Sequence, residues 1–81
     1  MEEIKTQVTT ILNKYIFDKK VWDSAPENPK IIENLKINSA RIVDIVIDIE
    51  ELYNIEIDNK SLEKIKTIQD IINVIQEKIK A

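Results

Sequence analysis

The chain has 81 residues, of which 43% are hydrophobic, which is enough for one compact domain with a single apolar core. It contains no Cys, His or Gly, so disulfides, thiolate or imidazole metal sites, Ser-His or Cys-His catalysis and glycine-rich phosphate loops are excluded. The net charge of −3 and the pI near 4.9 argue against a nucleic-acid partner, which requires a basic face.

The apolar runs are only a few residues long, and the chain begins Met-Glu-Glu without a basic leader. These features predict a cytoplasmic protein with no membrane span and no secretory signal. The charge is unevenly distributed, because six acids and one base lie between Arg41 and Asp58. This segment carries −5 and the remainder +2, a pattern that indicates basic partner surfaces.

The first predicted helix begins near Ile4 and fades between Phe17 and Lys20, because its apolar residues repeat with helical spacing. A long loop follows over residues 21–34, where Pro26 and Pro29 punctuate the chain. A loop of this length in a small domain needs apolar anchors. The residues expected to fold back onto the bundle are Val21, Trp22, Ile31, Ile32 and Leu35.

Residues 39–53 are rich in β-branched side chains, but their spacing predicts a helix. Asp44, Asp48 and Glu51 repeat at helical intervals on one face. The opposite face collects the apolar residues Ile42, Ile45, Val46, Ile49, Leu52 and Tyr53. Asn38 and Ser39 are both of types that cap helix N-termini, so the helix is expected to start there.

Two further helices complete the chain. Ser61 to Ile65 predicts a short helix after the turn residues Asp58 and Asn59. Thr67 followed by Asp70 resembles a capping box and predicts the start of a last helix. The inward stripe expected of that helix is Ile68, Ile71, Ile72, Ile75 and Ile79. The whole chain, residues 1–81, is therefore predicted to be one all-α domain.

Residues 31–75 share a series of features with one known family. An apolar residue lies four before Leu35, a serine four after it, and an acidic amphipathic helix follows. The matching segments further on are Glu50-Glu51, Tyr53, Ile55-Glu56-Ile57-Asp58, Glu63-Lys64-Ile65 and Thr67-Ile68-Gln69-Asp70. Together they resemble the acyl carrier protein family. The resemblance implies a four-helix bundle of acyl-carrier type with a long first loop and a short third helix.

The same resemblance implies a function and a site. Ser39 would carry a 4′-phosphopantetheine arm that a phosphopantetheinyl transferase adds from coenzyme A, and the arm would hold acyl groups as thioesters. The chain itself would be a non-catalytic monomeric carrier, with its reactive thiol on the cofactor. Partner enzymes, which are acyl-transferring enzymes and synthases with basic patches, would dock on Val43, Asp44, Ile47, Asp48, Glu50 and Glu51.

The sequence departs from the family at its hallmark. The usual Asp-Ser-Leu reads Asn38-Ser39-Ala40, Arg41 stands where many relatives are acidic, and Lys36 replaces the usual Gly after Leu35. We interpret these departures as signs of a specialised carrier that serves a dedicated pathway. Its transferase would then differ from the commonest ones.

Other interpretations remain open from sequence. Ser39 alone would be an ordinary N-cap, the acids a solvated helix face, and Val43 and Ile47 inward-packed residues. The chain would then be an unmodified helical interaction subunit, and an aminoacyl or peptidyl carrier is a further alternative. An enzyme with paired carboxylates is disfavoured because the acids lie on an exposed face. No metal site is expected, since a calcium loop of the Asp-x-Asp-x-Asp-Gly type is absent.

Overall fold

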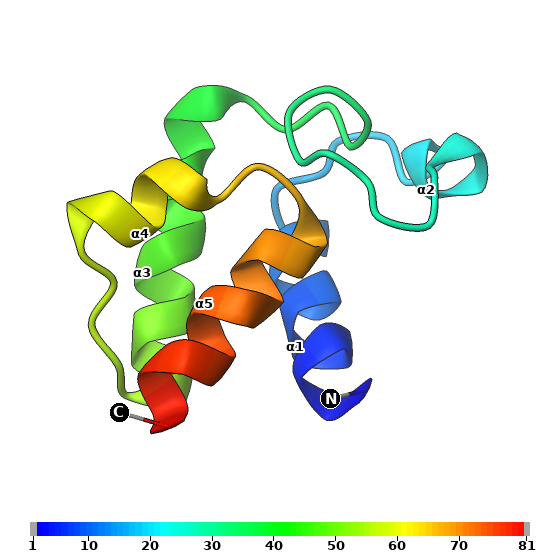
Figure 1. Cartoon of the computed structure of the whole chain (residues 1–81). Helices are drawn as coiled ribbons and strands as arrows, with labels where there is room; N and C mark the ends of the chain where they lie inside the picture. Colours follow the sequence, from blue (N-terminus) through cyan, green and yellow to red (C-terminus); the bar gives the residue numbers. More distant parts are fainter. Residues whose placement is uncertain (1, 81) are drawn as a thin grey trace.

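The computed structural model describes residues 2–80, and it is helical (Figure 1). Its elements are α1 (Glu2–Asn13), α2 (Val21–Ser24), the 3₁₀ helix η1 (Ser39–Arg41), α3 (Ile42–Tyr53), α4 (Asn59–Lys64) and α5 (Ile68–Lys80). Helices α1, α3, α4 and α5 form the four-helix bundle that the sequence predicted, and α2 is an extra turn within the long first loop. Among residues 2–80 the β-type pairing is confined to one isolated bridge between Lys30 and Thr67.

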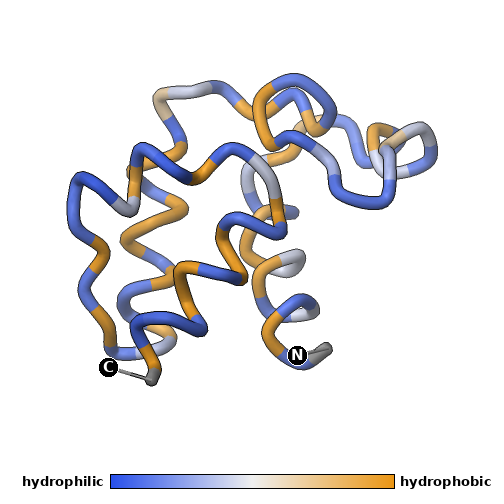
Figure 2. Tube along the Cα trace, in the orientation of Figure 1, coloured by the Kyte–Doolittle hydropathy of each residue, from blue (hydrophilic) through white to orange (hydrophobic). Residues whose placement is uncertain are grey.

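The core lies between α1, α3 and α5, with the first loop closing one end. Figure 2 shows apolar and polar residues alternating along these helices, as amphipathic helices require. The buried apolar side chains are Val8, Ile11, Leu12, Ile16, Ile31, Leu35, Ile37, Ile45, Val46, Ile49, Ile65, Ile68, Ile71, Ile72, Val74 and Ile75. Each stabilises the fold by roughly 1.5–3 kcal/mol relative to an exposed position, before the entropy of ordering is subtracted.

The first loop is held by contacts at both of its ends. Trp22 Nε1 donates to Asn13 Oδ1 at 2.7 Å, which fixes α2 against the end of α1. Further on, the Ile31 amide donates to the Lys66 carbonyl at 2.9 Å, which joins the loop to the segment before α5. Val21 and Trp22 are partly buried against the core, and Ile31 and Leu35 are fully buried. The predicted anchoring of these four residues is confirmed.

Three apolar residues assigned to the interior are instead exposed. Ile32 of the loop, Leu52 of α3 and Ile79 of α5 each have about half of their surface exposed. All three lie at the edge of an apolar stripe, where burial depends on whether a neighbouring element covers that edge. Ile42, also expected in the core, is only half-buried, because it lines a cleft described below.

Several helix boundaries differ from prediction. Helix α1 ends at Asn13 rather than near Phe17, and Lys19 Nζ then donates to the Ile16 carbonyl at 2.9 Å as the chain turns away. Helix α4 begins two residues early because Asp58 is its N-cap, accepting the Ser61 amide at 3.0 Å.

The predicted capping box at α5 is confirmed. The Thr67 amide donates to Asp70 Oδ2 at 3.0 Å, and the Asp70 amide donates to Thr67 Oγ1 at 3.1 Å. No helix among the described residues is both long and apolar enough to cross a bilayer.

Candidate functional site

The chain reaches Ser39 through a tight turn built on buried anchors. Leu35 and Ile37 are fully buried on either side of Lys36, which has a positive φ of 59°. A side chain with a Cβ is disfavoured in this left-handed conformation, whereas Gly adopts it freely. The turn therefore explains why a glycine suits this position, and Lys36 occupies it at some cost in stability.

The helix that begins at Ser39 is capped by its neighbour. Asn38 has extended backbone angles, and its Oδ1 accepts the Ala40 amide at 2.9 Å. The Asn38 carbonyl also accepts the Arg41 amide at 2.8 Å. Of the two capping candidates, Asn38 fills the role, so the ordinary explanation of Ser39 as an N-cap fails.

Ser39 is consequently exposed, and its hydroxyl forms no hydrogen bond with any residue in the part of the chain that the structure describes. It is the first residue of η1, which continues directly into α3. The amides of Ala40, Arg41 and Ile42 are already hydrogen-bonded, so what this terminus offers a bound anion is the positive end of the helix dipole. Arg41, two residues on, pairs with Asp44 through an Nη1–Oδ2 contact of 3.1 Å.

The outward face of α3 carries two apolar residues in line with Ser39. Val43 and Ile47 follow Ser39 at four-residue steps and have 55% and 44% of their surface exposed. These values exclude the inward packing that the sequence left open for them. Glu51, one helical turn beyond Ile47, is exposed and forms no ion pair with the other described residues.

The remaining predicted docking acids contact the protein itself. Tyr15 Oη donates to Asp48 Oδ2 at 2.5 Å, and Lys14 Nζ lies 3.1 Å from the same oxygen. The hydrogen bond from Tyr15 and, next, the one from Lys14 hold the pKa of Asp48 below its usual value. The same hydrogen bond raises the pKa of Tyr15 to about 12. Glu50 accepts the Ile57 amide at 2.7 Å, which ties α3 to the segment leading into α4.

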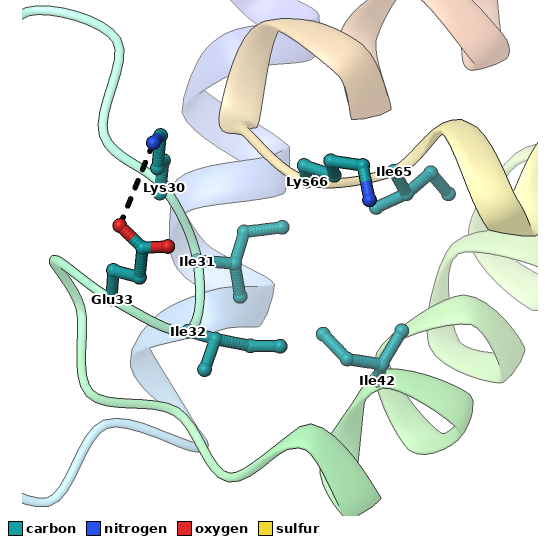
Figure 3. Close-up of a pocket in the computed structure, with 7 residues that line it drawn as sticks. All are labelled: Lys30, Ile31, Ile32, Glu33, Ile42, Ile65 and Lys66. Carbon is teal, nitrogen blue, oxygen red and sulfur yellow. Dashed lines mark ion pairs between the residues drawn. The ribbon is translucent and has the colours of Figure 1, made fainter.

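An apolar cleft lies beside the start of α3 (Figure 3). It has a volume of about 270 Å³ and is lined by Lys30, Ile31, Ile32, Glu33, Ile42, Ile65 and Lys66. The four isoleucine side chains point toward the shared space, and Lys30 and Glu33 form an ion pair of 3.5 Å at its edge. No sequence pattern predicts this cleft, because Ile31 and Ile32 were assigned separately as loop anchors and Ile42 to the core.

The described residues contain no group of three or more acids placed to hold a metal ion. The chemistry this region offers is therefore that of one free hydroxyl at a helix start, an apolar cleft nearby and an outward helix face.

Comparison with known proteins identifies the family. The chain is 32% identical over 78 residues to the acyl carrier protein of Thermotoga maritima, covering 96% of this chain and 94% of that one. It is 31% identical over 80 residues to the acyl carrier protein of Buchnera aphidicola subsp. Schizaphis graminum, covering 99% of each. A shorter match to the acyl carrier protein of Campylobacter concisus is 40% identical over 48 residues, 59% of this chain and 62% of that one. No protein-family model matches the chain.

This protein belongs to the acyl carrier protein family. Its role is that of a carrier and not of an enzyme.

Proposed function

We propose that this carrier holds acyl groups as thioesters on a 4′-phosphopantetheine arm attached to Ser39. The observation that carries the proposal is that Asn38 caps the helix and leaves the Ser39 hydroxyl exposed and without a partner among the described residues. Family membership over nearly the whole chain supports the same assignment. When bound, the arm supplies the thiol that the Cys-free chain lacks.

The residues around Ser39 fit an attached phosphodiester. The helix start favours a negative charge, and the Arg41 guanidinium has donors left after its single contact with Asp44. Attachment would replace the O–H bond of Ser39 with an O–P bond and release the nucleotide part of coenzyme A. The transferase would have to accept the proton, because no described acid or base hydrogen-bonds Ser39.

The cargo we propose is an acyl chain of fatty-acid synthesis or of a specialised lipid or polyketide pathway. The cleft beside Ile42 supports this choice, because four of its seven lining residues are isoleucines, which suit an aliphatic chain better than a polar aminoacyl group. Asn38 and Ala40 depart from the family's usual Asp and Leu, and both lie directly beside Ser39. These departures favour the specialised pathway.

Docking of partner enzymes is proposed on the outward face of α3. Val43, Ile47 and Glu51 are exposed there, and Asp44 contributes beside them. Asp48 and Glu50 complete the acidic surface, although each already binds another part of this chain. Basic partner surfaces would be attracted to this face and would bury the two apolar side chains on contact.

Incubation with coenzyme A and a phosphopantetheinyl transferase tests the attachment. Intact mass spectrometry should show the addition of one phosphopantetheine to the wild type and none to Ser39→Ala. Because Asn38 is the cap, Ser39→Ala should change the free energy of unfolding by no more than about 0.5 kcal/mol. Ser24→Ala is the matched control and should be modified like the wild type. A modified Ser39→Ala would refute the proposed site.

A further inference from the structure

Phe17 is completely exposed just beyond the end of α1. Single exposed apolar side chains are common, so exposure alone indicates little. Phe17, however, borders a hollow of about 540 Å³ that is also lined by Lys14, Tyr15, Ile16, Lys19 and Arg41. We call this surface the Phe17 patch. It combines two aromatic rings, those of Tyr15 and Phe17, with three cations, of which Lys14 and Lys19 follow α1 and Arg41 ends η1.

The Phe17 patch is basic, in contrast to the acidic α3. Residues 14–20 contain three lysines and one aspartate, and Arg41 adds a further positive charge. Lys14 and Arg41 each pair with a carboxylate of α3, whereas Lys19 Nζ contacts the neutral carbonyls of Asn13 and Ile16. The charge of Lys19 is therefore left for a partner, and a partner with carboxylates would complement this surface.

The Phe17 patch lies beside Ser39. Arg41 is the last residue of η1 and Ser39 is the first, so their Cα atoms are at most about 7.6 Å apart, twice the distance between consecutive residues. An enzyme that acts on the Ser39 hydroxyl itself must cover this neighbourhood. Enzymes that act later on cargo at the end of an arm do not have to approach so closely.

We propose that Phe17 and Arg41 form a recognition surface for the phosphopantetheinyl transferase, which places carboxylates around an apolar hollow that receives the Phe17 ring. This inference rests on the proposed function of Ser39. Arg41 has donors left after its contact with Asp44, so its positive charge two residues from the serine selects a transferase of complementary charge.

The test is steady-state kinetics of phosphopantetheine transfer, with the chain as the varied substrate, coenzyme A as donor and the host's own transferases. Phe17→Ser should raise KM by about tenfold, the effect of losing about 1.4 kcal/mol of contact, and should leave kcat nearly unchanged. Arg41→Glu should raise KM by at least as much and should also lower kcat, because the Arg41 guanidinium is also available to the phosphodiester that forms on Ser39. Ile79→Ser and Lys5→Glu are the matched controls, because both residues are exposed and lie outside the Phe17 patch. Their KM values should equal that of the wild type.

Salt adds a second readout. Opposite charges at the contact predict that the wild-type KM rises with ionic strength and that Arg41→Glu loses part of this dependence. A wild type that no transferase of the host modifies would refute the proposed function and this inference together. A modified wild type with unchanged KM for both variants, or a lower KM for Arg41→Glu, would overturn this inference alone.

Discussion

The two sides of α3 carry similar residues and use them differently. On the side facing α1, Asp48 binds Tyr15 and Lys14 and is only 25% exposed. Further toward the outward side, Glu51 is exposed and forms no ion pair with the other described residues, although it borders the same hollow as Asp48. Both acids belong to the same regular spacing in sequence. An acidic stripe on one helix can therefore include residues that hold the fold and residues that remain available to partners.

Replacing the two acids individually should separate these roles most clearly. Asp48→Ala removes the acceptor of Tyr15 and Lys14, and it should lower the free energy of unfolding by about 1–2 kcal/mol, since hydrogen bonds to charged groups are stronger than neutral ones. Glu51→Ala should change it by less than about 0.5 kcal/mol. Urea unfolding of both variants measures the difference. Equal changes in the free energy of unfolding would mean that the two acids do not differ in what they contribute to the fold.

The pH provides a control for the Asp48 variant. The pKa of Asp48 is lowered in the folded state, so its ionised form stabilises the protein above the unfolded pKa, near 3.8. This contribution is lost as the pH falls below that value toward the folded pKa. The difference in the free energy of unfolding between wild type and Asp48→Ala should therefore shrink below about pH 4. A difference that does not depend on pH would indicate lost packing instead.

A smaller effect on stability is expected at Lys36, which lies in the turn before Ser39. Lys36→Gly relieves the positive φ but makes the unfolded chain more flexible, so the net gain in stability should be about 0.5–1 kcal/mol. Lys60→Gly, within α4, should instead lower stability by up to about 1 kcal/mol. Thermal unfolding compares the two glycine variants, and destabilisation by Lys36→Gly would contradict the strain assigned to this turn.

The smallest effect on folding is expected from charge reversal on the outward side. Asp44→Lys with Glu51→Lys should leave the bundle stable within about 0.5 kcal/mol but should raise the KM of basic partner enzymes by about tenfold at low salt. Glu27→Lys with Glu77→Lys changes the net charge equally and should leave the KM unchanged. Unchanged kinetics for the α3 variant at low salt, where screening is weakest, would remove the docking role.

Much of the fold is predictable because its signals are local. The stripe of α5 and its capping box need only residues within a few turns of each other. Helix α2 was missed because four residues are too few to show a helical period, and Trp22 is held by Asn13, nine residues away. Ile32, Leu52 and Ile79 were misassigned because spacing identifies an apolar stripe but not what covers its edges.

In the candidate site, too, local features are predictable from sequence and long-range contacts are not. The position of Ser39 at a helix start follows from sequence, but two adjacent capping types left the choice of cap to the three-dimensional turn. The contact between Tyr15 and Asp48 spans 33 residues, so helical spacing within 39–53 cannot reveal it. The cleft beside Ile42 also joins segments that are distant in sequence, namely the first loop, α3 and the chain after α4.

The most direct test of the central claim is the intact mass of the protein purified from its own host, followed by peptide mapping. We expect a population that carries one phosphopantetheine, with the added mass on the peptide that contains Ser39 and none on the peptides containing Ser24 or Ser61. A protein that never carries the arm in its host, or that carries it on another residue, would contradict the role assigned to Ser39.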